Sequence, residues 1–183
     1  QEKVEAMKRR LLEINPEASI GAIRKKYSEE TAPQFDLDSY DYVIDCIDSL
    51  KNKALLILNA SASGARLFSS MGAALKLDPT KIKVAEFWDV RGCPLGAALR
   101  KKFRKSGTLP SKKFLCVYDE EVLPNRMESE EKANGSLVHI TAVFGFTLAG
   151  LVIKDMVQLQ AFSESSLPGG TPFGQSRFFS YLC

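Results

Sequence analysis

The sequence predicts an α/β fold whose sheet is mostly parallel and flanked by helices. The first observation is the order of segments, in which apolar strand-like runs alternate with amphipathic helix-like ones. The second is the run YDYVIDCID at 40–48, whose apolar middle is typical of a strand buried on both faces of a parallel sheet. The third is the composition: 183 residues with 45% hydrophobic and 26% charged side chains suit a globular core and exclude a disordered chain.

The first half of the chain is expected to supply the core strands and several helices. Apolar residues recur at three- and four-residue steps in the first segment, which predicts a helix that Asn15-Pro16 terminates. Turn and cap residues divide the remainder into short runs. The expected elements, in order, are helix 2–14, strand 18–27, helix 28–35, strand 40–48, helix 50–60 and strand 66–73.

The second half is expected to end in a long apolar helix. Pro94 suits the first position of a helix, and Leu95, Leu99 and Phe103 would lie along one face of it. From Gln158 onward Ser, Gly, Pro and Phe predominate, which predicts an irregular tail. The expected elements, in order, are extended segment 81–90, helix 93–105, strand 114–118, acidic loop 119–132 and helix 137–157.

Ligands of parallel sheets bind at the carboxyl ends of the strands, which here are expected at 45–49 and 69–74. Asp45 and Asp48 lie at the first of these ends, and Lys53 follows one turn into the next helix. Mg²⁺ on a nucleotide prefers one or two carboxylates together with phosphate oxygens and water, so the pattern suits a Mg²⁺–nucleotide site. The pattern equally allows a simpler interpretation, in which Asp48 only caps the helix and Asp45 is a charge at the sheet end.

A second charged feature is a run of seven cations between residues 100 and 113 that contains no acidic residue. Arg100 and Arg104, and likewise Lys101 and Lys105, are four residues apart and would align on a helix. Their repulsion costs roughly 0.2–0.5 kcal/mol per pair, and a polyanion would relieve it while releasing counterions. We therefore expect these four side chains to contact nucleic acid. A solvated helix face would have the same composition, and the net charge of +3 does not decide between the two.

Cysteine and histidine give little support for thiol, triad or metal chemistry. The four cysteines form no C-x-x-C pair, which excludes a zinc ribbon or a thioredoxin-type motif. Cys93, at an expected helix start beside Arg91, is either an activated nucleophile or a small residue without chemistry. His139 is the only histidine and lies in an apolar run, so a hydrogen-bonded core role is expected rather than a Ser-His-Asp triad.

The uncharged run 137–153 is 17 residues long, the lower end of what can span a membrane. It contains His139, Thr141 and Gly145, so we favour a buried core helix over membrane contact. The first fifteen residues are charged and helical and do not resemble a signal peptide. Together with the cysteine pattern, this favours a reducing, cytoplasmic setting.

Several segments together are similar to a known superfamily. KVEAM at 3–7, INP at 14–16 and DYVIDCIDS at 41–49 resemble the ThiF and MoeB adenylating enzymes of the ubiquitin-activating-enzyme-like superfamily. Further segments resemble one branch of it, the tRNA threonylcarbamoyladenosine dehydratases: LDPTKI at 77–82, GCPLG at 92–96 before the basic helix, NGS at 134–136 and TAVFG at 141–145. The similarity extends from about residue 1 to about residue 158.

The resemblance implies a Rossmann-like ThiF/MoeB fold, binding of ATP and Mg²⁺, and a homodimer. It implies an enzyme that dehydrates threonylcarbamoyladenosine in the anticodon loop of tRNA by cyclisation, through an adenylated carboxylate. In this sequence Lys3 would contact the ATP phosphates as a catalytic residue, and Asp48 would serve Mg–ATP as catalytic and metal-binding residue, with Ser49 beside it. Lys53 would match a basic cofactor-binding position after that motif, and the basic helix would be the tRNA surface.

The resemblance also concerns segments that this sequence does not contain. The family's glycine-rich phosphate turn and first βαβ unit precede the KVE segment, and no G-x-G-x-x-G occurs in these 183 residues. We therefore expect 1–158 to form the C-terminal portion of an adenylating domain with weak ATP binding and an unpaired sheet edge, followed by an irregular tail at 159–183. Two alternatives stay open. One is activation of a ubiquitin-like sulfur-carrier protein, with a cysteine desulfurase as a further partner; the other is a non-catalytic module that binds tRNA or dimerises.

Overall fold

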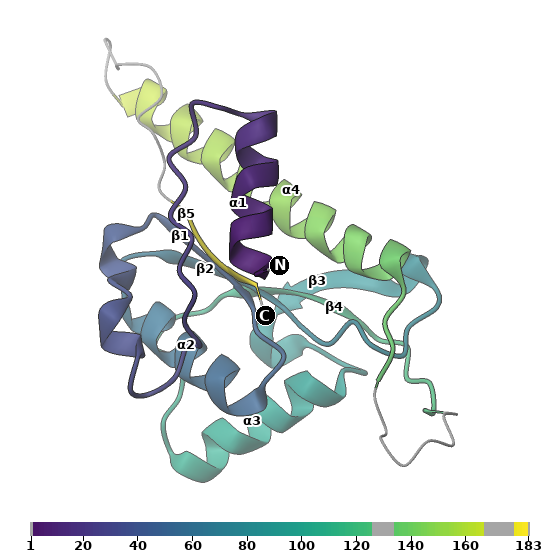
Figure 1. Ribbon diagram of the computed structural model, residues 1–183. Helices are drawn as coiled ribbons and strands as arrows, with labels where there is room; N and C mark the ends of the chain where they lie inside the picture. Colours follow the sequence, from purple (N-terminus) through teal and green to yellow (C-terminus); the bar gives the residue numbers. More distant parts are fainter. Residues whose placement is uncertain (1, 126–133, 167–177, 183) are drawn as a thin grey trace.

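The computed structural model describes residues 2–125, 134–166 and 178–182, with side chains as far as 159. Within these residues, five strands form one sheet in the order β3-β4-β2-β1-β5 (Figure 1). The four parallel strands are β1 (Tyr42–Cys46), β2 (Arg66–Ser70), β4 (Leu115–Asp119) and β5 (Phe178–Leu182). β3 (Ile82–Glu86) pairs antiparallel with β4. The predicted α/β class with a mostly parallel sheet is confirmed.

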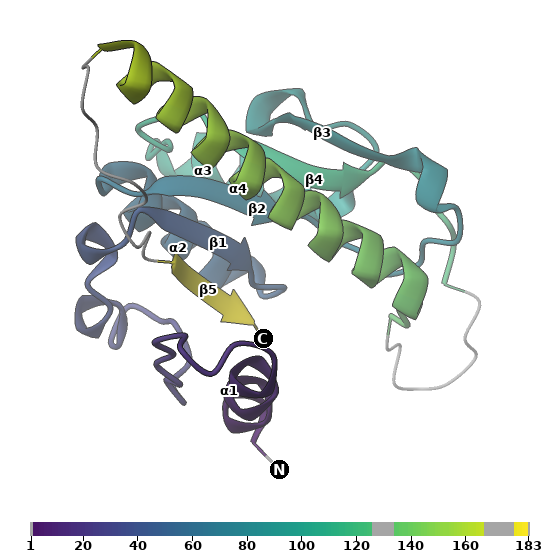
Figure 2. The same cartoon turned by 90° about the horizontal axis from the view of Figure 1, so that it is seen from above.

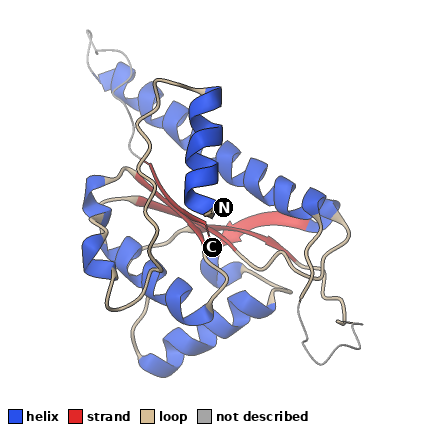
Figure 3. Cartoon of the chain, viewed as in Figure 1, coloured by secondary structure: helices blue, strands red, loops and turns tan. Residues whose placement is uncertain are grey.

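Helices cover both faces of this sheet, as Figure 2 and the colouring of Figure 3 show. In the described part of the chain the α-helices are α1 (Lys3–Ile14), α2 (Leu50–Ala62), α3 (Pro94–Ser106) and α4 (Val138–Ser166). α2 and α3 lie on one face, and α4 crosses the other (Figures 1 and 2). Short 3₁₀ turns are η1 (Ala32–Gln34), η2 (Leu37–Ser39), η3 (Pro79–Lys81) and η4 (Phe87–Asp89).

Strand β1 separates two apolar layers, because successive side chains of a strand point to opposite faces. Val43 packs into the larger layer, together with Leu56 of α2 and Leu99 of α3. Tyr42 packs into the smaller layer, with Phe144 of α4. The prediction that this strand is buried on both faces is therefore confirmed, and the strand order places β1 between β2 and the edge strand β5.

Helix α4 packs on the sheet along one side only. Ile140, Phe144 and Leu148 recur every four residues and are buried, whereas Phe146 is 76% and Ile153 60% exposed. The expectation of a buried core helix thus holds for one side of α4. In the described part of the chain, Val138–Leu159 is the one helical stretch long and apolar enough to cross a membrane by length and composition.

Two expected elements in the first half are wrong. Residues 18–27 form no strand, because no neighbouring strand supplies a hydrogen-bond ladder to them. The helix expected at 28–35 is reduced to the single turn η1, where the Thr31 hydroxyl accepts a hydrogen bond from the Ser28 N–H at 3.0 Å. Helix α1 is confirmed, yet it buries no side chain; Met7 and Leu11 on its apolar side remain more than 40% exposed.

The expectation of an irregular tail from 159 onward is wrong over two stretches. Helix α4 continues to Ser166, and 178–182 forms β5, which pairs in parallel with β1. The remainder of the expected tail, 167–177 and 183, lies outside the described residues. The sequence FFSYL at 178–182 has high strand propensity, and the open side of β1 offers unpaired N–H and C=O groups. β5 therefore covers the open side of β1 and is itself the edge strand on that side of the sheet.

Candidate functional site

A buried polar network joins the carboxyl ends of β1 and β2. Asp45, fully buried, accepts hydrogen bonds from the Ile47 N–H at 3.0 Å on one oxygen and from the Ser69 hydroxyl at 2.7 Å on the other. Lys53 of α2 lies 2.8 Å from that second oxygen and donates to the Ser70 carbonyl at 2.7 Å. The network therefore attaches the start of α2 to both strands and fixes the turn that follows β1.

This network defines what Lys53 does in the structure. Its side chain is fully buried, and its ammonium group is engaged by Asp45 and the Ser70 carbonyl. A buried charge is costly unless it is paired and hydrogen-bonded, and both conditions are met here. Lys53 thus lies beneath the strand ends, and contact with a ligand's phosphate would require this pair to open; its cofactor-binding role stays a prediction.

The remaining predicted site residues of the first half lie at the surface. Asp48 is exposed at the carboxyl end of β1. Ser49 is half-buried as the residue before α2, and its side chain accepts no capping hydrogen bond from the helix N–H groups. Lys3 is exposed at the start of α1, which lies beside the end of β5 in both views (Figures 1 and 2). Lys3 and Asp48 form no ion pair with each other within the described residues. Both side chains are thus available to a ligand.

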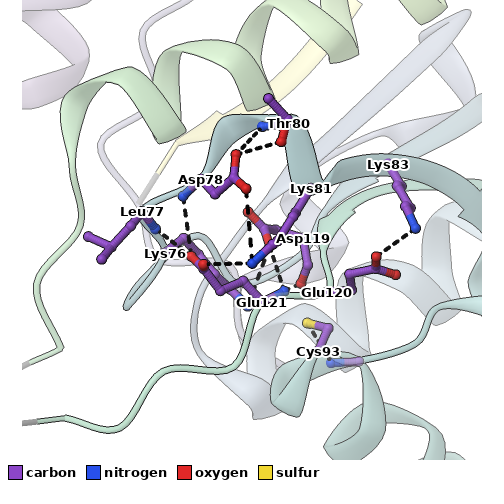
Figure 4. A network of polar contacts seen from close by, with 11 residues as sticks. Lys76, Leu77, Asp78, Thr80, Lys81, Lys83, Cys93, Asp119, Glu120 and Glu121 are labelled. Atoms are coloured by element: carbon purple, nitrogen blue, oxygen red, sulfur yellow. Dashed lines mark hydrogen bonds and ion pairs between the residues drawn. The ribbon is translucent and has the colours of Figure 1, made fainter.

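A second polar network lies at the carboxyl end of β4 (Figure 4). Asp119 is fully buried and accepts a hydrogen bond from the Glu121 N–H at 2.7 Å, while the Lys76 ammonium donates to the Asp119 carbonyl at 3.1 Å. Glu121 in turn accepts from the Leu77 N–H at 2.6 Å and pairs with Lys81 at 3.1 Å. This network holds the segment between β2 and β3 against the end of β4.

The charges of this second network are set by hydrogen bonds. The Leu77 N–H lowers the pKa of Glu121, with further lowering by Lys81. The hydroxyl and N–H of Thr80 lower the pKa of Asp78.

The sequence analysis assigned Asp119 to an acidic loop and missed this second network. The sequence did contain a signal for this network. Asp119 comes at the end of an apolar run, as Asp45 does after the apolar residues of β1.

The four predicted nucleic-acid contacts share helix α3. Lys101, Arg104 and Lys105 are exposed, and Arg100 is half-buried, with one N–H donated to the Phe87 carbonyl at 3.3 Å. Lys112, from the same basic run, donates to the carbonyls of Ser63 at 2.5 Å and Ala65 at 2.8 Å and so stabilises the end of α2. The basic run therefore divides into cations open to solvent and at least one cation with a structural role.

Cys93 and His139 do not form a catalytic pair. Cys93 is 3% exposed, and its sulfur accepts a hydrogen bond from the Gly96 N–H at 3.4 Å, which caps α3. His139 is exposed and lies 3.1 Å from the Leu77 carbonyl, so it is hydrogen-bonded as expected but is not a core residue. Within the described residues, no group of three or more His, Cys, Asp or Glu side chains is arranged to hold a metal ion.

Known proteins are similar to this chain in both sequence and fold. The ThiF family model matches residues 1–168. The tRNA threonylcarbamoyladenosine dehydratase of Bacillus subtilis (strain 168) is 32% identical over 170 residues, which cover 86% of this chain and 67% of the relative. The enzyme of the same name from Escherichia coli (strain K12) is 29% identical over 178 residues, covering 85% and 66%.

Solved structures agree with the sequence relatives. The E. coli tRNA N6-threonylcarbamoyladenosine dehydratase in complex with AMP superposes with a TM-score of 0.75 at 30% identity, covering 87% of this chain and 65% of that one. The complex of that enzyme with ATP gives a TM-score of 0.75 at 29% identity. This chain spans about two thirds of the length of these relatives. By the extent of the family match and the shared fold, the chain belongs to the ThiF family.

Proposed function

We propose that the protein containing this chain uses ATP to dehydrate threonylcarbamoyladenosine in the anticodon loop of tRNA, through an adenylated carboxylate. The named relatives are dehydratases of that nucleoside, and similar solved structures hold AMP or ATP. Within this chain, the observation that carries the proposal is the exposed carboxylate of Asp48. It stands at the carboxyl end of β1, on a turn that the buried Asp45–Lys53 pair fixes.

The donor set at this edge fits a Mg²⁺ ion carried by a nucleotide. Mg²⁺ sites of this kind need one or two carboxylates, with phosphate oxygens and water as the other ligands. Asp48 is exposed and can supply such a carboxylate, whereas both oxygens of Asp45 already accept hydrogen bonds. Asp48 would therefore hold the ion, which when bound neutralises charge on the phosphates.

The proposed chemistry begins with a carboxylate, whose oxygen is a poor leaving group. That oxygen attacks the α-phosphorus of ATP and pyrophosphate leaves, which gives an acyl adenylate. A nitrogen or oxygen nucleophile of the same modified nucleoside then attacks the activated carbonyl, the ring closes and AMP leaves. The nucleoside has lost one water in total. Lys3, exposed at the start of α1, would stabilise charge that develops on the phosphates.

The proposal also covers the contact with tRNA, the oligomeric state and the cellular compartment. The exposed Lys101, Arg104 and Lys105 are expected to contact the tRNA backbone. A homodimer is supported by the apolar residues that α4 leaves exposed, among them Phe146 and Ile153. A reducing, cytoplasmic setting is consistent with Cys93 and Cys116, which are free cysteines in the described residues.

The sulfur-carrier alternative has less support from the geometry. Such an activating enzyme would use a reactive cysteine as a relay, and Cys93 was the candidate. Its thiol is buried and already accepts a hydrogen bond from the Gly96 N–H, so a carrier protein's C-terminus could not reach it without movement of α3.

The test uses the complete natural protein that contains this chain, incubated with ATP, Mg²⁺ and tRNA bearing threonylcarbamoyladenosine. The expected result is a nucleoside lighter by one water, measured by mass spectrometry after digestion, together with release of AMP and pyrophosphate. Unchanged nucleoside mass while ATP is bound would contradict the proposal. Pyrophosphate exchange that depends on a sulfur-carrier protein, and not on tRNA, would favour the alternative.

A further inference from the structure

Three arginine side chains converge on the turn between β3 and α3. Arg91 donates from one guanidinium nitrogen to the carbonyls of Trp88 at 2.9 Å and Val90 at 3.2 Å. Arg100 of α3 donates to the carbonyl of Phe87 in the same turn at 3.3 Å. The guanidinium carbon of Arg104, one helical turn further, lies 5.4 Å from the centroid of the Trp88 ring. We call Arg91, Arg100 and Arg104 the arginine cluster.

The arginine cluster carries positive charge that the protein does not neutralise. None of its three guanidinium groups forms an ion pair with a carboxylate in the part of the chain that the structure describes. Glu86 and Asp89 flank the same turn, but Glu86 accepts a hydrogen bond from the Trp88 N–H instead. Burial lowers the pKa of Arg100, and the nearby charges of Arg91 and Arg104 lower it further.

The turn that bears the cluster is held in place by two glycines. Gly92 has a φ of +64°, and a Cβ there would lie 2.5 Å from the Glu120 carbonyl oxygen, so the chain beside Arg91 packs directly against the segment after β4. A Cβ on Gly96 would lie 3.1 Å from a side-chain carbon of Val90, so the lack of a side chain there lets α3 pack closely against the same turn. The cluster is therefore organised before any ligand arrives.

We propose that the arginine cluster and Trp88 form a binding site for the phosphodiester backbone and an unpaired base of single-stranded RNA. Arginine N–H groups that remain free can bind phosphate oxygens in pairs, and aromatic rings and guanidinium groups such as those of Trp88 and Arg104 are the side chains on which an unstacked base rests. Anchoring to backbone carbonyls limits the conformational entropy that binding would remove. This inference rests on the proposed tRNA substrate and adds Trp88 and Arg91, which sequence reasoning did not assign.

The position of the site suits a loop that must also reach the adenylation edge. Gly92 packs against Glu120, which follows β4 at the same sheet edge where β1 ends before Asp48. The cluster thus extends from the exposed side of α3 toward the carboxyl ends of the parallel strands. An RNA loop held along it would have one end directed to that edge.

Trp88 makes the experiment specific, because it is the only tryptophan in the chain. The purified chain is titrated with a single-stranded oligoribonucleotide of about eight nucleotides, a typical site size, while tryptophan emission is recorded. The expected result is saturable quenching whose affinity falls as salt is raised. Inorganic phosphate and ATP, titrated in parallel, should not give saturable quenching at comparable concentrations. Saturation by ATP and not by RNA would overturn the proposal in favour of a nucleotide site.

Variants distinguish RNA binding at this site from general electrostatic attraction of RNA to the protein. Arg91→Gln and Arg104→Gln should each weaken RNA binding about tenfold and lower the salt slope by about 0.7. Trp88→Leu, followed by anisotropy of labelled RNA, should weaken binding about tenfold or more while the salt slope is unchanged. Lys102→Gln removes the same charge from the opposite side of α3 and should have a smaller effect. Circular dichroism confirms that each variant is folded.

Equal losses for Lys102→Gln and Arg104→Gln, or RNA binding without any change in Trp88 emission, would overturn the proposal. These measurements need no ATP turnover, so their failure is distinct from failure of the proposed function. RNA binding that depends on the cluster, in a protein that never dehydrates the nucleoside, would contradict only the proposed reaction. Dehydration by a protein whose RNA affinity is insensitive to Arg91→Gln, Arg104→Gln and Trp88→Leu would contradict only the proposed site.

Discussion

The ammonium group of Lys53 lies 2.8 Å from a carboxylate oxygen of Asp45, and neither side chain reaches solvent. The pair connects the start of α2 to the end of β1, and the second acceptor of Lys53, the Ser70 carbonyl, connects both to β2. The turn that presents Asp48 is thus built on a buried ion pair. The contribution of this ion pair to the free energy of unfolding can be measured separately from catalysis.

Removal of one member of the pair should destabilise the fold strongly. Lys53→Met leaves the Asp45 carboxylate buried without its counter-ion, and loss of one partner of a buried pair costs about 3–5 kcal/mol. The double variant Asp45→Asn/Lys53→Met should be less destabilised than the sum of the single variants, because no charge then remains buried. Urea denaturation provides the free energies of unfolding. Additive single effects would show that the two groups do not interact energetically.

The exposed site residues should affect activity without affecting stability. Asp48→Asn and Lys3→Gln in the complete protein should each lower the dehydration rate by about a hundredfold or more, because each group acts on charge that develops in the transition state. Asp48→Asn should also raise the Mg²⁺ concentration needed for half-maximal rate. Glu17→Gln, a change at another exposed carboxylate, serves as control. Normal rates in both site variants would remove the assignment of Asp48 and Lys3.

Tyr42 should make the stability of the protein depend on alkaline pH. Burial, together with its hydrogen bond to Asp155 at 2.8 Å, raises the pKa of Tyr42 to about 12. The folded state therefore keeps the Tyr42 proton at a pH where the unfolded chain, with an ordinary value near 10, has lost it. This contribution to stability is complete below pH 10 and is lost as pH rises to about 12.

Thermal or urea unfolding of wild type and Tyr42→Phe tests this pH dependence. The wild type should be more stable than the variant at pH 8, because Tyr42 keeps its hydrogen bond to α4. The difference between the two proteins should shrink steadily between pH 10 and 12. A difference that stays constant over this range would mean that Tyr42 titrates in the same way in both states.

Two glycines with positive φ should respond differently to the same substitution. Gly92 (φ +64°) and Gly107 (φ +72°) both adopt the left-handed conformation, but only at Gly92 would a Cβ meet other atoms, the nearest at 2.5 Å. Gly107→Ala should cost roughly 1–2 kcal/mol, the penalty of the left-handed conformation alone. Gly92→Ala should cost more, because the backbone beside Glu120 must also shift. Chemical denaturation of the two variants gives the comparison, and equal costs would contradict the close packing at Gly92.

The sequence by itself determined the elements whose signals are local. The three- and four-residue apolar steps of α1, Pro94 at the start of α3 and the apolar run of β1 were each readable from a few adjacent residues, and each is confirmed. The carboxyl end of β1 as a ligand position follows from the general rule for parallel sheets and stays a prediction. The similarity to the ThiF family also resided in short segments of sequence, and the family match over residues 1–168 confirms it.

Only the tertiary structure decided which side chains meet. Residues 18–27 have strand-like composition yet form no strand, and FFSYL at 178–182 became one by pairing with β1, because a strand exists only where a neighbour supplies its hydrogen bonds. Lys53 was predicted only as a cofactor-binding residue, and the structure adds that it is the buried partner of Asp45. Arg91 and Arg104 are thirteen positions apart and meet around Trp88 only because a turn and a helix pack together. Local preference depends on neighbours along the chain, whereas burial and charge pairing depend on neighbours in space.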